Sequence, residues 1–210
     1  MATKIRKAKL ERKSTETVIK AELNVDGKGQ SKIKTPIGIL THMLELFTFH
    51  GFFDLSLEVK GDTHVDIHHT NEDIGIVLGK IFKEALKDKK GIKRFGSAFA
   101  PMESTLGHTV IDISGRGYLH LTLDDAKAET LPQISNEGKY TFQHLEHFLE
   151  SFAHQLGANL IVTIKNPVDS KADLHTIMET VFKSLGMALD QATQIDPRRK
   201  IVPSTKGIID

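Results

Sequence analysis

Apolar residues recur at helical spacing in four segments of the chain. In residues 38–50 and 142–156 they stand three and four positions apart, which places them on one face of a helix. Two longer segments, 68–87 and 174–193, are followed by Gly91 and Pro197, residue types that commonly follow the end of a helix. The pattern therefore predicts four helices, a shorter and a longer one in each half of the chain.

Strand signals stand between these segments. Residues 15–25 and 106–114 are rich in β-branched side chains and run into glycine-containing turns at Asp26-Gly27 and at Gly115, which favours hairpin strands. Residues 55–59 and 159–164 alternate or run apolar for the length of a strand. Each half is thus predicted to hold strands, a helix, a strand and a second helix. Helices layered on sheets in this way form an α+β sandwich.

The order of elements is repeated, and individual residues are repeated with it. LNVDGKG from Leu23 matches IDISGRG from Ile111. One such match can arise by chance, but an ordered series of them indicates a duplication. We therefore predict a tandem duplication within one compact unit, with residues 1–90 as the first half and residues 91–210 as the second. At offsets of 105 and then 107 residues, the matched pairs include His42 with His147, Glu45 with Glu150, Glu72 with Glu179, and Gly79 with Gly186.

Composition excludes several classes of protein. The 28 Lys and Arg residues balance 27 Asp and Glu residues, so no overall charge favours nucleic acid or anionic membrane. The absence of cysteine excludes disulfides and zinc-thiolate sites. No apolar run approaches the ~20 residues of a membrane span, and the basic N-terminus lacks the apolar core of a secretory signal. We expect a cytoplasmic protein that binds neither nucleic acid nor membrane, with the basic run from Lys4 to Lys13 as a solvated face.

Histidines and carboxylates gather in the duplicated helical segments. Residues four apart share a helix face, so His68 can point together with Glu72, and His175 with Glu179. His68 and the adjacent His69 diverge by about 100°, so they would serve two different metal ions. Imidazole with carboxylate suits Mn, Fe, Zn, Co or Ni better than Mg or Ca. A single string of this kind is weak evidence, but its repetition in both halves predicts a metal site.

Several basic residues near glycines are candidates for binding a phosphate-like anion. In most proteins such residues simply line solvated loops, and the sequence leaves both interpretations open. The candidates are Arg94, Arg116, Lys183 and the segment SerThrLysGly from Ser204.

These strings together resemble the imidazoleglycerol-phosphate dehydratases of histidine biosynthesis. The resemblance implies an α+β fold made by tandem duplication, similar to domain 2 of ribosomal protein S5. It also implies a 24-subunit homo-oligomer built from trimers, with two Mn²⁺ ions per active site held by ligands from more than one subunit. It covers nearly the whole chain and rests on ERKSTET from Glu11, HMLELFTFHG, GDTHVDIHHTNEDIGIVLG, DKKGIKRFGSAFAPM, DISGRG, HFLESFA and VPSTKGII.

Position by position, the resemblance assigns roles to residues of this chain. The implied reaction removes water from imidazoleglycerol phosphate to give imidazoleacetol phosphate, without an organic cofactor. Glu16 matches a catalytic acid or base, and His42, Glu72 and Glu179 act at the metals. The implied metal ligands are His42, His68, His69, Glu72, His147, His175 and Glu179. The substrate phosphate would be held by Arg94, Arg116, Lys183, Ser204 and Lys206.

Three positions depart from the family pattern. Thr176 stands where the family has the second histidine of its last cluster, so one of the two metal sites is expected to lose a strong ligand unless His144 replaces it. Ser104 removes a carboxylate at the position that the repeat makes equivalent to Glu16. Thr41 replaces an aspartate that would orient the following imidazole. All three changes fall at the expected metal sites.

Two functions from different classes remain open on the sequence. One is a dehydratase, working or weakened; the other is a homologue that binds metal and phosphate but has lost dehydratase chemistry, because of Thr176 and Ser104. A zinc hydrolase is disfavoured because the chain has no HExxH string. The presence of Glu16 and of every phosphate-binding candidate favours the dehydratase.

Overall fold

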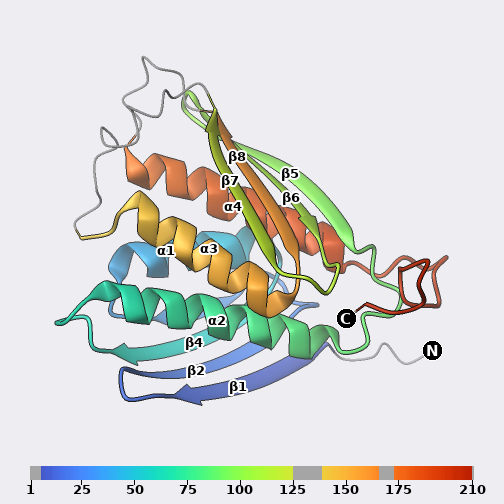
Figure 1. Cartoon of the computed structure of the whole chain (residues 1–210), viewed down its shortest axis with the longest axis horizontal. Coiled ribbons are helices and arrows are strands. Elements are labelled where there is room, and N and C mark those ends of the chain that lie inside the picture. Colours follow the sequence, from blue (N-terminus) through green and yellow to red (C-terminus); the bar gives the residue numbers. More distant parts are fainter. Residues whose placement is uncertain (1–5, 125–138, 166–172, 210) are drawn as a thin grey trace.

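Two four-stranded sheets enclose four helices in the computed structural model, which describes residues 6–124, 139–165 and 173–209 (Figure 1). Each half contributes one sheet and two helices, so the expected α+β duplication is confirmed. The first half comprises β1 (Lys7–Lys13), β2 (Thr17–Asn24), β3 (Ser31–Lys34), α1 (Gly38–His50), β4 (Asp54–Gly61) and α2 (Ile67–Leu86). The second comprises β5 (Phe95–Met102), β6 (Thr105–Asp112), β7 (Tyr118–Asp124), α3 (Phe142–Leu156), β8 (Asn159–Lys165) and α4 (Leu174–Thr193).

The two sheets have the same strand order, β1-β2-β4-β3 and β5-β6-β8-β7. The hairpins expected at Asp26-Gly27 and Gly115 are therefore wrong, because β4 lies between β2 and β3, and β8 between β6 and β7. In each half the chain crosses over through a helix to make a parallel pair, β3 with β4 and β7 with β8. The hairpins instead join β1 to β2 and β5 to β6, through turns at residues 14–16 and 103–104.

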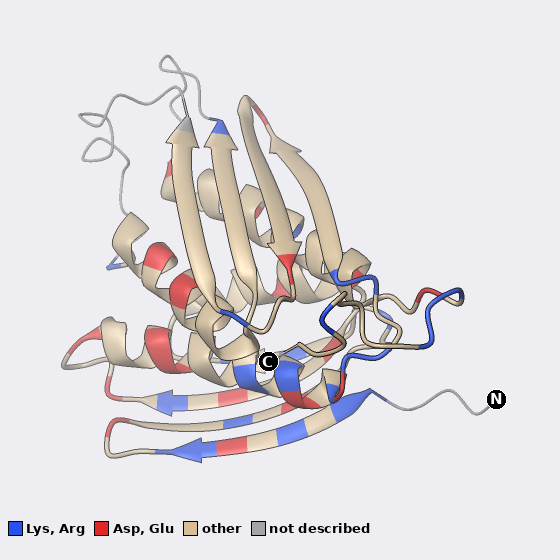
Figure 2. Cartoon of the chain, turned by 45° about the vertical axis from the view of Figure 1, so that its right-hand side comes forward, with Lys and Arg blue, Asp and Glu red and all other residues tan. Residues whose placement is uncertain are grey.

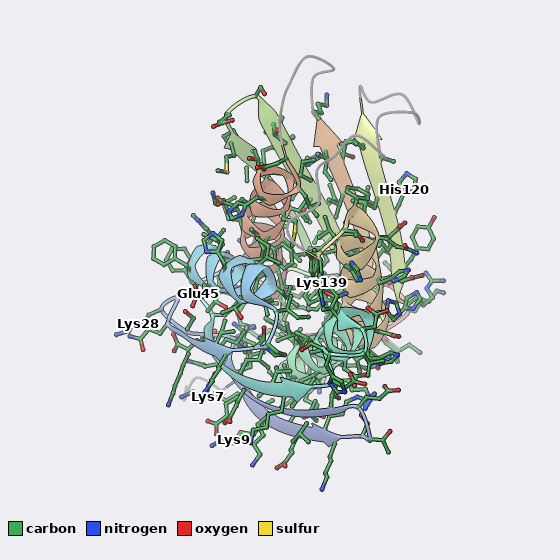
Figure 3. The ribbon with its side chains drawn as sticks, turned by 90° about the vertical axis from the view of Figure 1, so that its left-hand side faces the viewer. Lys7, Lys9, Lys28, Glu45, His120 and Lys139 are labelled. Carbon is green, nitrogen blue, oxygen red and sulfur yellow. The ribbon has the colours of Figure 1, made fainter. Side chains whose placement is uncertain are left out.

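The helices lie between the sheets and pack against each other across the two halves. Helices α1 and α2 cover the first sheet, and α3 and α4 cover the second. Across the middle of the molecule α2 packs on α3, and α1 packs on α4. Figure 3 shows the four helices nearly end-on between the sheets. These two helix pairs form most of the contact between the halves, and smaller contacts add to it, such as the hydrogen bond from Tyr140 to Asn71.

Two glycines at matched positions allow the helices to approach closely. A Cβ atom on Gly79 of α2 would lie 2.5 Å from the carbonyl oxygen of Phe152 on α3. The same atom on Gly186 of α4 would lie 2.5 Å from the carbonyl oxygen of Phe47 on α1. Because both distances are below van der Waals contact, each helix crossing requires a residue without a side chain. The repeat of glycine at the offset of 107 residues thus has a packing reason.

Polar side chains cap three helices at the end where the histidines lie. Asp66 accepts from the backbone amide of His68 at the start of α2, and Asp173 accepts from Thr176 at the start of α4. Thr141 and His144 form a reciprocal capping box at the start of α3. Such caps satisfy backbone amides that have no partner within the helix. They fix the first turn of each helix, where the metal-ligand candidates stand.

The outer faces of the two sheets differ in chemistry. The first carries alternating lysines and glutamates, among them Lys9 paired with Glu22 at 2.6 Å. The part of the basic run that is described forms edge strand β1, and its lysines at 7, 9 and 13 are exposed as expected, whereas Lys4 lies outside the described residues. The second sheet presents almost no charge to solvent (Figure 2). Its exposed apolar residues are Phe95, Phe99, Tyr118 and Ile161.

None of the helices within the described ranges is long and apolar enough to cross a lipid bilayer.

Alanine at Gly79 or Gly186 is expected to lower the free energy of unfolding by about 1–3 kcal/mol, the usual cost of overpacking. Alanine otherwise stabilises a helix interior by about 1 kcal/mol relative to glycine, so a loss marks the steric clash. Urea unfolding measures the change. Gly38→Ala is the control, because nothing lies within 4 Å of its added Cβ. Wild-type stability in both variants would contradict the close crossings.

Candidate metal centre

The first histidine cluster joins α1 to α4 and consists of His42, His175 and Glu179; we call it the α1–α4 cluster. The Nε2 atoms of His42 and His175 lie 3.4 Å and 3.2 Å from Oε1 of Glu179. One ligand atom from each residue falls within 4.8 Å of the others, close enough to hold one metal ion. The α1–α4 packing therefore brings a first-half histidine to a second-half His-Glu pair.

Glu179 is the most buried member of this cluster, with 12% of its side chain exposed. Burial by itself would raise its pKa, but hydrogen bonds from Lys183 and His42 outweigh burial and hold the pKa below its ordinary value. The carboxylate is thus charged at neutral pH. Lys183 stands one turn further along α4 and bonds Oε2 of Glu179, while Oε1 faces the two imidazoles. Lys183 therefore lies beside the α1–α4 cluster as the ion-pair partner of Glu179.

The second cluster joins α2 to α3 and consists of His68, Glu72 and His147; we call it the α2–α3 cluster. Nδ1 of His68 lies 3.1 Å from Nδ1 of His147, and Nε2 of His68 lies 3.6 Å from Oε2 of Glu72. Its residues correspond to those of the α1–α4 cluster with the two halves exchanged, but His68 faces His147 with one ring nitrogen and Glu72 with the other, so the ligand atoms do not converge on one point. Among the described residues, only His42, His175 and Glu179 bring three such atoms within 4.8 Å of one another. Each cluster combines two imidazoles with one carboxylate, a donor set that fits a borderline divalent metal and leaves positions open for substrate.

His144 lies beside the α2–α3 cluster, and its ring centre is 6.4 Å from that of His68. Its Nδ1 accepts the backbone amide of Thr141 at 3.1 Å, as part of the capping box. Since Nδ1 is the acceptor, Nε2 of the neutral ring carries the proton and offers no lone pair to a metal. Burial, with the charges of His68 and His147, lowers the pKa of His144. In this geometry His144 serves as a cap and not as a replacement ligand.

His69 points away from both clusters. Its Nδ1 lies 3.4 Å from Oδ2 of Asp62 and 3.9 Å from Oε1 of Glu16. The hydrogen bond with Asp62 raises the pKa of His69, and the charge of Glu16 adds to the effect. His68 and His69 thus face different partners, because His68 lies beside His147 and Glu72 whereas His69 lies beside Asp62. Glu16, the acid or base expected from the sequence, lies beside His69 and not beside the clusters of its own chain.

Thr176 occupies the position in α4 that His69 occupies in α2. Its backbone amide donates to Asp173, and its side chain is not part of the α1–α4 cluster. Ser104 lies exposed in the β5–β6 turn, which corresponds to the β1–β2 turn that carries Glu16. The two departures thus fall on equivalents of the neighbours Glu16 and His69. Among the described residues, the second half thus has no counterpart of the pair formed by Glu16 and His69.

The remaining phosphate candidates gather at the opposite end of the second sheet. Nε and Nη2 of Arg94 lie 2.6 Å and 3.0 Å from the two carboxylate oxygens of Asp112, and Nη1 donates to the carbonyl of Pro203, next to Ser204. Arg116 follows β6 in the turn toward β7, and its side chain is exposed. The exposed Lys206 lies in the same C-terminal segment as Ser204. Lys183 alone of the five lies near a metal cluster.

The distance between the α1–α4 cluster and Arg94 follows from their positions along α4. The backbone amide of Arg94 bonds to the carbonyl of Ala192, thirteen residues after Glu179. A helix rises about 1.5 Å per residue, so the two positions lie roughly 20 Å apart. In Figure 1 the first turns of α2, α3 and α4 lie at the left and the C-terminal segment at the right. One copy of the chain thus separates its metal clusters from most of its phosphate candidates.

Two functional neighbours escaped sequence reasoning, Asp62 beside His69 and Asp112 beside Arg94. Their partners lie 7 and 18 positions away across loops and strands, so helical spacing could not reveal them. The only available signal was the position of each aspartate at the end of a strand. The matched pair Glu45 and Glu150, by contrast, is exposed and belongs to neither cluster.

A family model described as imidazoleglycerol-phosphate dehydratase matches residues 35–189. The imidazoleglycerol-phosphate dehydratase of Bacillus subtilis (strain 168) is 47% identical over 205 residues, which cover 98% of this chain and 100% of the relative. That of Pelobacter propionicus is 46% identical over 204 residues, covering 97% of this chain and 99% of the relative.

Solved structures give the same result. A crystal structure from Pyrococcus furiosus, in complex with (S)-C348, is 33% identical with a TM-score of 0.76 and covers 95% of this chain and 99% of that one. The imidazoleglycerol-phosphate dehydratase from Staphylococcus aureus is 31% identical with a TM-score of 0.73, covering 90% and 99%. The likeness therefore extends over both halves of the fold.

Glu179→Gln is expected to lower the affinity for Mn²⁺ at least roughly tenfold, because it removes the negative charge of the carboxylate that faces both imidazoles of the cluster. Changes to residues that only support metal ligands already cost about tenfold. Competition with a chromophoric chelator measures the affinity. Glu84→Gln is the control, since Glu84 is exposed near the far end of α2. Equal affinities in both variants would exclude the α1–α4 cluster as a metal site.

Proposed function

The chain belongs to the imidazoleglycerol-phosphate dehydratase family, and we propose that it dehydrates imidazoleglycerol phosphate to imidazoleacetol phosphate at metal sites shared between copies of the chain. The hydro-lyase activity in histidine biosynthesis follows from relatives matched along their whole length. The alternative of a homologue with weakened or lost activity has no support in these comparisons. In this proposal residues 1–90 and 91–210 are the two repeats of one unit, and the protein acts in the cytoplasm.

The distance along α4 between the metal cluster and Arg94 is the main support for a site shared between copies of the chain. In the substrate, three carbons separate the imidazole from the phosphate. The distance between these two groups is therefore less than about 11 Å, the length of two helical turns. The metal clusters and Arg94 of one copy lie roughly 20 Å apart by the helix rise. A substrate with its imidazole at a metal therefore reaches the Arg94 region only if a second copy supplies it. The phosphate ligands in the proposal are Arg94, Arg116, Lys183, Ser204 and Lys206.

The uncharged outer face of the second sheet supports self-association. Phe95 and Phe99 are each 58% exposed, Tyr118 56% and Ile161 43%. An apolar surface of this kind is unusual on a monomer and favours contact with another protein surface. The lysine-rich first sheet is a poor partner for it, because its charges would be desolvated. The assembly in the proposal is the 24-subunit homo-oligomer built from trimers that the family resemblance implies.

The metals in the proposal are two Mn²⁺ ions per active site, one at each kind of cluster. His42, His175 and Glu179 hold one, and His68, Glu72 and His147 hold the other. His69 completes a metal site of a neighbouring copy, because it points away from the clusters of its own chain. The corresponding outward ligand of the second half is lost at Thr176, so one of the two metals has fewer protein ligands.

The reaction needs a held substrate and a base. Bound metal supplies Lewis-acid polarisation, which lets the substrate imidazole act as an electron sink. Glu16 accepts the proton from the carbon adjacent to the one that loses its hydroxyl, the hydroxyl takes up a proton and leaves as water, and the resulting enol converts to the ketone. Glu16 is suited to this because its carboxylate lies beside the outward-facing His69 and is about half exposed, at 47%. Arg and Lys contacts to the phosphate keep the reacting atoms aligned.

Purified protein loaded with Mn²⁺ is expected to convert imidazoleglycerol phosphate to imidazoleacetol phosphate, and removal of metal by a chelator is expected to abolish turnover. Product formation is followed directly by chromatography or NMR. Glu16→Gln should retain Mn²⁺ and substrate binding while turnover falls about 100-fold or more, the usual contribution of a general base. Substrate binding without turnover by the Mn²⁺-loaded wild type would overturn the dehydratase assignment.

A shared site also predicts complementation between inactive variants. Glu179→Gln removes the metal side of the site, and Arg116→Ala removes an exposed phosphate contact on the other side. Mixed before assembly, the two variants should recover up to about a quarter of wild-type activity, because that share of interfaces pairs two intact contributions. The control mixture of Glu179→Gln with His175→Asn, both in one cluster, should remain inactive. Equal activity of the two mixtures would place the whole site within one copy.

A further inference from the structure

The loop between β4 and α2 presents a carboxylate to the outward-facing histidine. Asp62 follows directly after β4, and its Oδ2 lies 3.4 Å from Nδ1 of His69. The loop itself is held by backbone hydrogen bonds, from Asp62 to the carbonyl of Glu16 and from Val65 to the carbonyl of Asp62. Asp62 is therefore fixed in place before any ligand binds, and it stands between the β1–β2 turn and the first turn of α2.

The partial burial of Asp62 costs free energy, because one of its carboxylate oxygens has no hydrogen-bond partner among the described residues. Only 21% of its side chain is exposed, and Oδ1 is buried without a hydrogen-bond partner among the described residues. A buried carboxylate oxygen without a donor costs free energy. His69 is the only ionisable or donor side chain that the described residues bring to this carboxylate. The observation points to a role for the pair beyond the stability of the loop.

We propose that Asp62 is a positioning residue: it accepts the Nδ1 proton of His69 and so keeps the lone pair of Nε2 directed outward, toward a metal ion held by a neighbouring copy. The inference rests on the proposed function, in which His69 is such a ligand. The two nitrogens of an imidazole are coupled, since a hydrogen bond at one fixes which form the other takes. Nε2 of His69 makes no hydrogen bond within the described part of the chain, so it is available.

This assignment separates the two acidic neighbours of His69 by role. Asp62 is near enough to orient the ring, whereas Glu16 at 3.9 Å is beyond hydrogen-bond distance. Glu16 is also the more exposed of the two, at 47% against 21%. Because Asp62 orients the imidazole, Glu16 remains free to exchange a proton with substrate. The aspartate thus acts through His69, and the glutamate acts on the reacting atoms.

The second half offers no equivalent of this pair, because Thr176 replaces the histidine. Within the described residues, each copy therefore offers one imidazole of this type, and Asp62 is its hydrogen-bond partner. A change at Asp62 is expected to affect every shared metal site that uses His69, with no second copy of the pair to compensate.

Asp62→Ala and Asp62→Asn are compared with the wild type by two measurements. The first is the tautomer of His69 in the metal-free protein at alkaline pH, read from ¹⁵N chemical shifts with His69→Gln to assign the signal. The wild type should carry the proton on Nδ1; in Asp62→Ala it should shift to Nε2; in Asp62→Asn the amide oxygen should largely retain it on Nδ1. The second is Mn²⁺ affinity of the assembled protein, expected to fall about 10- to 100-fold in Asp62→Ala and less in Asp62→Asn.

An unchanged tautomer and unchanged Mn²⁺ affinity in Asp62→Ala would overturn the proposal. Should that variant fail to fold, Asp62→Asn, which keeps the size of the side chain, decides by both readings: a proton found on Nε2 of His69 together with wild-type Mn²⁺ affinity would overturn the proposal, because His69 would then bind metal equally well without a hydrogen bond from Nδ1. Glu58→Gln, an exposed position on β4, is the matched control and should leave both readings unchanged. The tautomer does not depend on turnover, so failure of the dehydratase assignment would be recognised separately, by inactivity of the Mn²⁺-loaded wild type.

Discussion

The packing of helix on helix across the two halves is the constraint on which the rest of the molecule depends. Gly79 and Gly186 let α2 approach α3 and α4 approach α1 until a backbone carbonyl of the partner blocks any side chain. Because cores are close-packed, the crossings hold the helices in one register. That register sets His42 against Glu179 and His68 against His147. Neither half contains a complete cluster, so the duplication produces a metal centre only when the halves are joined.

The electrostatics of the site are arranged in pairs of acid and base. Each imidazole cluster includes a carboxylate, and Lys183 adds a cation that keeps Glu179 charged despite its burial. Asp62 and Glu16 provide the same kind of environment for His69, which raises its pKa. Carboxylates beside imidazoles favour binding of a cation from outside. The first half thus carries Glu16 and His69 side by side, whereas in the second half Ser104 and Thr176 stand at the corresponding positions.

The sequence predicted the helices better than the strands, for a physical reason. The bounds of α1, α3 and α4 agree with the apolar pattern, because each helix buries one face over three or more turns. Strands β1, β3, β5 and β7 were not predicted. Strands β1 and β3 are lysine-rich edge strands, and β3 is only four residues long. Strand β5 exposes alternate residues on the outer face of the second sheet. The residues Asp26 and Gly27 correctly indicated that the chain turns after β2. They did not indicate that the next strand pairs with β4 instead of β2, because strand order depends on pairing between segments far apart in the sequence.

Residue types and their spacing along the chain determined the family, the duplication, the metal-binding residue types and the different directions of His68 and His69. These follow from helix geometry, which acts between neighbours in sequence. Only the tertiary structure decided which histidines share a cluster, that His144 is a helix cap, and that Asp62 holds His69. It also decided that the clusters and Arg94 lie at opposite ends of α4. Contacts of this kind join residues far apart in the chain, and their distances are set by the packing of whole elements.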